Sequence, residues 1–139
     1  MKLPFPIPGL VIRYAYLWHA EFTKGRTLGT KDRPCVVVLA VTRQAGGEVM
    51  VSVAPITHAA PGNPNSAIKL TPATQRRLGL DQAQCWIMAT EINQFKWPGP
   101  DIAPTPAGNY AYGELPAAVF LALKEKILSG PVPGVARTD

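Results

Sequence analysis

The sequence contains little cysteine and few charged residues. Its 139 residues include 2 cysteines, and charged residues make up 17% of the chain. Two cysteines are too few for the disulfide framework that stabilises many small secreted domains, and both Cys35 and Cys85 lie inside apolar stretches. We therefore expect two buried, reduced thiols, as in a cytoplasmic protein.

Segments for membrane insertion or export are also missing. No uncharged apolar run approaches the roughly 18 residues that a membrane-spanning helix needs. Lys2 precedes an apolar stretch, but Pro4, Pro6 and Pro8 would break a signal-peptide helix, and Arg13 interrupts the apolar run after them. We expect a cytoplasmic protein that does not bind a membrane.

Common signatures of metal and cofactor chemistry are absent from the sequence. It has no P-loop, no GxGxxG motif for dinucleotides and no GxSxG motif for a nucleophilic serine. The histidines, His19 and His58, and the two cysteines do not have the spacing of zinc ligands. We therefore expect neither a metal nor a cofactor.

The composition predicts one domain with a basic surface. With 47% hydrophobic residues, a chain of this length can bury a core without cross-links. We expect a single domain over residues 1–130 and a flexible tail over residues 131–139. Lys and Arg outnumber Asp and Glu by 14 to 9, giving a net charge of +5, which fits an acidic partner or simply a basic surface.

Apolar patterning predicts a mainly β fold. Runs rich in β-branched and aromatic residues predict strands at 10–18, 35–41, 48–56, 67–70, 85–89 and 91–97. The run at 35–41 is continuously apolar, which predicts a central strand buried on both faces. Gln44–Gly47 predicts a hairpin turn, and the Pro- and Gly-rich stretch 98–113 predicts a long loop.

Two helices complete the predicted fold, a small barrel or rolled sheet with helical additions. Thr71 and Pro72 are typical of a helix N-terminus, and this helix should end at Gly79. Pro116 begins a second helix that reaches about Ser129. Its apolar surface is wider than one core requires, so we expect part of it to contact a second copy in a homodimer.

Three side chains at the ends of predicted strands suggest a catalytic cluster. Arg33 precedes the central strand, and Thr57 and His58 follow the third strand, which a hairpin would bring back beside Arg33. A guanidinium stabilises phosphate charge, whereas a hydroxyl and an imidazole can orient a ribose 2′-OH and accept its proton. Taken singly, each residue has an ordinary structural role, such as an ion pair of Arg33 with Asp32 or Glu48.

A basic loop precedes this cluster in the sequence. Residues 19–32 are polar and include Gly25 and Gly29, which is typical of a loop. Lys24, Arg26 and Lys31 lie in this stretch, so we expect them to bind RNA phosphates. Aromatic residues later in the chain could stack on bases, although their spacing is more typical of core residues.

The order of these motifs resembles that of the MazF/PemK family of toxins. The matching stretches are Gly9–Trp18, Lys24-Gly25, Arg33-Pro34, Val36–Leu39, Val53–Thr57 and Trp86–Asn93. The resemblance covers about residues 9–129. After Gly25 this chain reads Arg26-Thr27-Leu28, where many members of the family have a glutamate.

The resemblance implies an SH3-like barrel with a terminal helix, a homodimer and a metal-independent endoribonuclease that an acidic antitoxin neutralises. The catalytic arginine and threonine of the family correspond to Arg33 and Thr57. They would assist attack of the 2′-OH on the adjacent phosphate of single-stranded RNA, leaving a 2′,3′-cyclic phosphate. Two alternatives remain: a non-catalytic CcdB-like protein that binds DNA gyrase, and a degenerate homologue that binds only RNA or its antitoxin.

Overall fold

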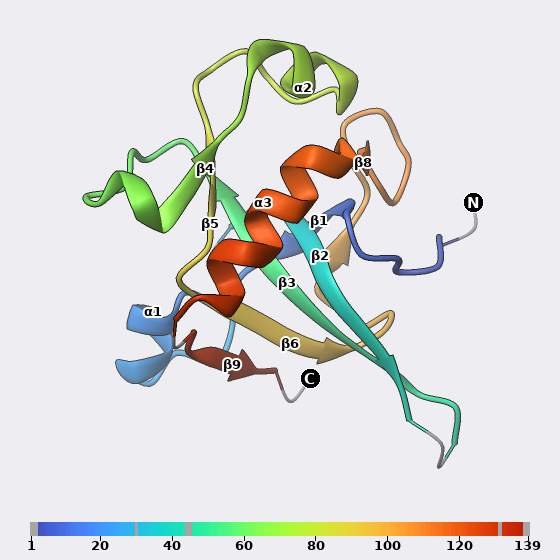
Figure 1. Cartoon of the computed structure of the whole chain (residues 1–139). Coiled ribbons are helices and arrows are strands. Elements are labelled where there is room, and N and C mark those ends of the chain that lie inside the picture. Colours follow the sequence, from blue (N-terminus) through green and yellow to red (C-terminus); the bar gives the residue numbers. More distant parts are fainter. Residues whose placement is uncertain (1–2, 30, 44–45, 131, 138–139) are drawn as a thin grey trace.

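A mainly antiparallel sheet forms the body of the protein in the computed structural model (Figure 1), which describes residues 3–29, 31–43, 46–130 and 132–137. The elements are β1 (Leu10–Ala15), α1 (His19–Thr23), β2 (Asp32–Thr42), β3 (Val49–Thr57), the 3₁₀ helix η1 (Pro64–Ser66), β4 (Ala67–Lys69), α2 (Pro72–Arg77), β5 (Trp86–Met88), β6 (Ile92–Lys96), β7 (Ile102–Ala103), β8 (Gly113–Glu114), α3 (Ala117–Leu128) and β9 (Gly134–Ala136). The predicted mainly β fold with a C-terminal helix is confirmed.

The strands follow the order β4-β5-β3-β2-β1-β7, with β8 on β1 and with β6 joining β3 to β9. The predicted β2–β3 hairpin forms, and its register places Cys35 opposite Pro55. The predicted turn residues Gln44 and Ala45 lie outside the described residues. Within the described part of the chain, no strand pairing joins the two ends of this order, so the sheet is not closed.

Both faces of the sheet are covered where β2 crosses its centre. Val36 packs into one apolar cluster with Leu123 of α3, and α3 lies across this face in Figure 1. Cys35 and Val37 pack into a second cluster on the opposite face. The prediction of a strand buried on both faces therefore holds at its centre but fails beyond it, because Leu39 is 52% exposed on the projecting β2–β3 arm.

Helices α2 and α3 begin as the sequence predicts. The Thr71 hydroxyl accepts a hydrogen bond from the backbone N–H of Thr74, which caps α2. In α3, Leu123 is fully buried, whereas Leu121 and Leu128 remain exposed. The core therefore uses one stripe of α3 and leaves part of its apolar surface uncovered.

Three segments differ from their predicted structure. The expected loop at 98–113 contains β7, which pairs with β1, and the first residue of β8. The expected loop at 19–32 begins with the five-residue helix α1, which buries none of its side chains and so lacks an apolar stripe in the sequence. The tail expected to be flexible after Gly130 includes β9, which pairs in parallel with β6. Burial of Val135 and Arg137 explains why these residues are ordered.

Arg137 attaches the C-terminal segment to the sheet through several polar contacts. Its Nη2 lies 2.9 Å from Asp101 Oδ2, and its Nη1 donates a hydrogen bond of 2.8 Å to the carbonyl oxygen of Ala15. Its guanidinium also lies over the Tyr14 ring, 5.4 Å from the centroid. An arginine buried in this way is paired with a carboxylate, as buried charges require.

No helix among the described residues has the length and apolar character needed to cross a membrane.

Candidate functional site

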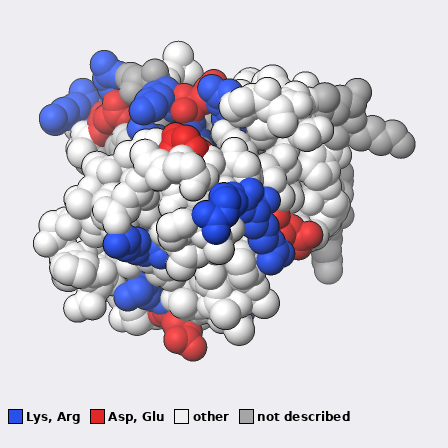
Figure 2. All heavy atoms as spheres, turned by 90° about the horizontal axis from the view of Figure 1, so that it is seen from above, with Lys and Arg blue, Asp and Glu red and all other residues white. Residues whose placement is uncertain are grey.

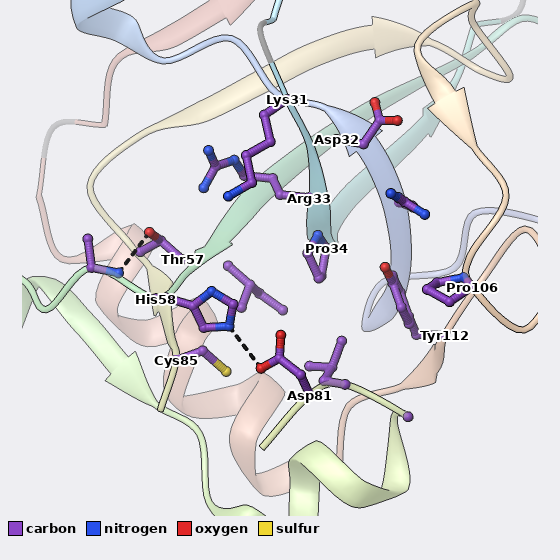
Figure 3. Close-up of a pocket in the computed structure, with 15 residues that line it drawn as sticks. Lys31, Asp32, Arg33, Pro34, Thr57, His58, Asp81, Cys85, Pro106 and Tyr112 are labelled. Atoms are coloured by element: carbon purple, nitrogen blue, oxygen red, sulfur yellow. Dashed lines mark hydrogen bonds and ion pairs between the residues drawn. The ribbon is translucent and has the colours of Figure 1, made fainter. Parts of the chain in front are cut away.

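A pocket of about 720 Å³ lies where β2 begins and β3 ends (Figure 3). Its walls come from these strand ends, from β1, from the loop that follows α2 and from the long loop before β8. They are Arg13, Lys31, Asp32, Arg33, Pro34, Ile56, Thr57, His58, Ala59, Gly79, Leu80, Asp81, Cys85, Pro106 and Tyr112. The pocket thus brings together the predicted residues Arg33, Thr57, His58 and Lys31.

Arg33 is held beside the pocket by an aromatic ring. Its guanidinium carbon lies 5.0 Å from the centroid of Trp18, a cation–π contact that restricts the side chain without using its terminal N–H groups. Its Nε is buried and has no hydrogen-bond partner in the described part of the chain. The alternative ion pair with Asp32 does not form among the described residues, so the guanidinium can receive an anion.

Thr57 ends β3 with its hydroxyl in a local turn. Its Oγ1 accepts a hydrogen bond of 3.1 Å from the backbone N–H of Ala59. Because the oxygen acts as the acceptor in this contact, the hydroxyl proton can be donated to a ligand. Thr57 is therefore a strand-end turn residue that also lines the pocket.

His58 is paired with a carboxylate that sequence analysis did not identify. Its Nε2 lies 3.0 Å from Asp81 Oδ1, as the dashed line in Figure 3 shows. An ionised carboxylate can only accept, so in this contact Nε2 carries the proton, and a neutral imidazole then has Nδ1 as its acceptor. Asp81 is itself positioned by the backbone N–H of Ala83, 3.1 Å from the same Oδ1.

The imidazole and the carboxylate are both well exposed, with 53% of the His58 side chain and 64% of the Asp81 side chain accessible. Solvent screens such a pair, so its contribution to folding stability is small. Its importance is geometric, because it fixes which imidazole nitrogen can accept a proton inside the pocket.

Basic side chains surround the strand ends. In Figure 3 the side chains of Lys31 and Arg33 lie on the same side of the pocket as Thr57, whereas Pro106 and Tyr112 lie on the opposite side. Arg13 also lines the pocket, and its Nη1 donates a 3.3 Å hydrogen bond to the carbonyl oxygen of Pro104. The cavity is thus lined by three cations and by two carboxylates, those of Asp32 and Asp81, and the excess of positive charge favours an anionic ligand.

The other two predicted RNA-binding residues lie apart from this pocket. Lys24 caps the C-terminal end of α1, and Arg26 lies 3.6 Å from Glu21 in an exposed ion pair. Neither residue lines the cavity. Figure 2 shows the same pattern on one face of the molecule, where Lys and Arg form separate groups, several with Asp or Glu beside them.

Sequence analysis missed three polar residues of the pocket. Arg13 lies inside a predicted strand. Asp81 lies in the loop after Gly79, where the predicted helix ends, and Tyr112 lies in the Pro- and Gly-rich stretch. Only their positions in space connect them with Thr57. One signal in the sequence could have identified Arg13 as a candidate site residue. It is a charged residue in a strand whose neighbouring residues are buried.

Both cysteines are free and buried, as predicted. Burial raises the pKa of the Cys85 thiol to about 11, and the nearby Asp81 charge adds to this increase. Burial also raises the pKa of Cys35. Although Cys85 lies at the pocket wall, its thiol is therefore protonated at neutral pH and is a poor nucleophile.

Among the described residues, no three His, Cys, Asp or Glu side chains are arranged to hold a metal ion.

Comparison of the chain with protein-family models and with curated proteins gave no match.

Proposed function

We propose that this protein is an endoribonuclease that cleaves single-stranded RNA by attack of a ribose 2′-OH on the adjacent phosphate. The observation that supports the proposal most is the shared pocket, which is lined by Arg33, Thr57 and His58 from two strand ends. Such a reaction requires a cation that binds the phosphate, a hydroxyl group that donates a hydrogen bond, and a group that accepts the proton of the 2′-OH.

In the proposed reaction, His58 Nδ1 removes the proton of the 2′-OH. The 2′ oxygen then forms a bond to phosphorus, and the bond from phosphorus to the 5′ oxygen of the next nucleotide breaks. The departing 5′ oxygen takes a proton from water, and the hydroxide that remains takes the proton held by His58, which restores the neutral imidazole. The products are a 2′,3′-cyclic phosphate and a 5′-hydroxyl, and neither a metal nor a cofactor enters the reaction.

Arg33 and Thr57 would act on the charge that develops at the phosphate. The cation–π contact with Trp18 holds the guanidinium before the substrate binds, so little reorganisation is needed as negative charge increases. The Thr57 hydroxyl, whose oxygen is held by the Ala59 N–H, can donate its proton to a phosphate oxygen. Lys31 adds a second cation beside Arg33.

The wider proposal is a cytoplasmic toxin of the MazF/PemK type. It includes an SH3-like barrel arrangement of the strands, a homodimer, and neutralisation by an acidic antitoxin that covers the basic pocket. The position of Arg33-Pro34 at the start of β2 and of Thr57 at the end of β3 supports this assignment. A CcdB-like gyrase-binding protein would not require Arg33 and Thr57 together in one cavity.

The direct test is cleavage of single-stranded RNA by purified protein in the presence of EDTA. We expect activity to survive chelation, since the proposed catalytic groups are side chains. Arg33→Ala should slow cleavage about 10²- to 10³-fold, as loss of one preorganised donor does elsewhere. Thr57→Ala should have a comparable effect, and the double variant should be much less impaired than the product of the two effects predicts.

Arg43→Ala is the matched control, because Arg43 is an exposed arginine on the distant β2–β3 arm. It should cleave at the wild-type rate. Products with a 3′-hydroxyl and a 5′-phosphate would exclude internal attack by the 2′-OH. Wild-type rates in both Arg33→Ala and Thr57→Ala would exclude this pocket as the active site, and inhibition of gyrase without RNA cleavage would favour the CcdB-like alternative.

A further inference from the structure

A second hollow of about 250 Å³ adjoins the pocket. The two cavities share three wall residues, Gly79, Pro106 and Tyr112. The two cavities therefore lie next to each other, and a ligand longer than one cavity can contact both. Such an arrangement suits an extended ligand better than a single small molecule.

The second hollow has its own cations. Arg76 and Arg77, in the last turn of α2, line it and are exposed. In the part of the chain that the structure describes, neither arginine has a carboxylate within ion-pair distance. Two adjacent guanidinium groups of this kind beside a hollow can bind a phosphate through paired N–H donors.

Helix α2 is fixed relative to the catalytic pocket. The Gln75 side chain is buried, and its Nε2 donates hydrogen bonds of 2.8 Å to the carbonyl oxygen of Asp81 and 2.7 Å to that of Ala83. The same short loop carries the Asp81 carboxylate that contacts His58. The position of the two arginines is therefore coupled to that of the proposed proton acceptor.

Tyr112 lies at the junction of the two cavities, where it packs against the core cluster that contains Leu78 and also lines both cavities. It is half-buried, and burial raises the pKa of its hydroxyl, so this group stays a hydrogen-bond donor in the physiological range. A phenol ring flanked by arginines is the combination that binds single-stranded nucleic acid, through base stacking on one side and phosphate contacts on the other.

We propose that the hollow formed by α2 and the loop before β8 is a subsite for a nucleotide one position beyond the two that the cleaved phosphodiester joins, with Arg76 and Arg77 on its phosphate and Tyr112 against its base. This inference rests on the proposed ribonuclease function and extends it. An acidic peptide would satisfy the arginines but would leave the Tyr112 ring without a stacking partner, so the observations favour RNA.

The test compares RNA substrates of different length. A dinucleotide spans only the cleaved phosphate, and two trinucleotides extend it by one nucleotide on the 5′ or on the 3′ side. In each trinucleotide a 2′-O-methyl group prevents cleavage at the other phosphodiester, and each is used as a mixture of all sequences. The double variant Arg76→Gln/Arg77→Gln should lower kcat/KM about five- to tenfold for one of the two trinucleotides. It should leave cleavage of the dinucleotide unchanged, because the dinucleotide does not reach α2.

Two further measurements separate base stacking from charge. Tyr112→Leu should reduce cleavage of the same trinucleotide about fivefold or more, in the range of a lost base–aromatic stack. The slope of log affinity against log salt for a 2′-O-methyl trinucleotide should become shallower by about 0.7 for each phosphate that the arginine variant no longer binds. Arg43→Gln, with the same change of charge on the β2–β3 arm, should alter neither quantity.

The outcomes distinguish the subsite from the function. If the arginine variant loses activity equally on all substrates, or on none, the subsite is wrong although the ribonuclease function stands. Tighter binding of a glutamate-rich peptide than of the trinucleotide, abolished in the arginine variant, would also overturn the subsite in favour of a protein partner. If wild-type protein cleaves RNA of no length, the proposed function fails and the subsite fails with it.

Discussion

Asp81 fixes the orientation of His58, and this single contact determines which nitrogen can accept a proton. The ion pair is exposed, so its loss should hardly affect folding, whereas it should affect a reaction that depends on Nδ1. If Asp81 acts only through His58, the effects of substituting both residues will not add, whereas independent residues give additive effects.

We predict that His58→Ala slows RNA cleavage about 10²- to 10⁴-fold, the usual range for a lost general base. Asp81→Asn should slow it less, about tenfold, because an amide can still contact the imidazole but also favours the other tautomer. In the His58→Ala background, Asp81→Asn should have no further effect. Single-turnover cleavage rates measure all three, and equal, multiplicative losses would show that Asp81 acts elsewhere.

The two buried cysteines predict a loss of stability at alkaline pH. In the folded protein, burial raises the pKa of Cys85 to about 11 and raises that of Cys35 as well, from an ordinary value of 9.0. Above pH 9 the unfolded chain therefore binds fewer protons than the folded protein, and the free energy of unfolding falls as pH rises. Below pH 9 these thiols contribute no pH dependence.

Urea unfolding at intervals from pH 8 to pH 10.5 measures this decline. Cys35→Ala should flatten it, because one of the titrating groups is removed, even though the variant is less stable at pH 8. A decline of unchanged slope in both Cys35→Ala and Cys85→Ala would assign the pH dependence to other groups. The buried Tyr16, whose pKa burial also raises, is then the next candidate.

At the scale of elements, the loop between α1 and β2 places Lys31 and Arg33 at the pocket, and Gly29 determines its path. A Cβ atom at Gly29 would lie 2.5 Å from the carbonyl oxygen of Ala15 and 2.6 Å from that of Tyr16. Backbone atoms cannot move away as a flexible side chain can. The loop therefore passes close to the end of β1 only because residue 29 is glycine.

We expect Gly29→Ala to lower the free energy of unfolding by about 1–3 kcal/mol, the usual cost of overpacking. It should also slow RNA cleavage, because the loop that carries Lys31 must shift. Gly62→Ala is the control, since a Cβ there meets no atom within 4 Å. Thermal unfolding and cleavage assays test both variants, and a Gly29→Ala protein as stable as Gly62→Ala would contradict the close approach.

Local signals in the sequence were sufficient for the elements that have strong periodicity or caps. Thr71 and Pro72 predicted the start of α2, and the apolar run at 35–41 predicted the centre of β2. The hairpin between β2 and β3 then brought Arg33 and Thr57 together, as expected. These parts were predictable because each depends on neighbours in the sequence or on one tight connection.

Other features depend on packing between distant segments and could not be read locally. Helix α1 has five residues and no buried side chain, and β9 has three residues in a Pro- and Gly-rich context. Asp81 contacts His58 only because Gln75 holds the loop after α2 in place. The spacing of apolar residues along the sequence cannot predict such a contact, because the contact joins a loop to the end of a strand.

At the scale of the whole molecule, exposed apolar residues of α3 predict self-association. Leu121 is 57% exposed and Leu128 is 74% exposed, whereas Leu123 on the same helix is fully buried. Contact between two copies would remove these side chains from water, a gain of about 25 cal/mol for each Å² of apolar surface. The widened surface of α3 thus supports the homodimer in our proposal.

We predict a dimer in solution, with a mass about twice the 14.9 kDa of the chain. Leu121→Glu/Leu128→Glu should convert it to a monomer, because dimerisation would bury two carboxylates without partners. Leu28→Glu is the control, since Leu28 is 62% exposed but lies outside α3. Light scattering at micromolar concentration measures the mass, and a wild-type monomer would remove the reason for placing an interface on α3.

The attachment of Arg137 to the sheet also has a consequence for folding during synthesis on the ribosome. Its guanidinium contacts both Ala15 and Asp101. This cluster therefore joins three residues that are far apart in the sequence and are synthesised at different times. During synthesis, Asp101 emerges from the ribosome before the arginine that neutralises it. Nascent chains that end between residues 101 and 137 therefore lack this arginine, and the region around β1 and β6 becomes complete only when residue 137 has emerged.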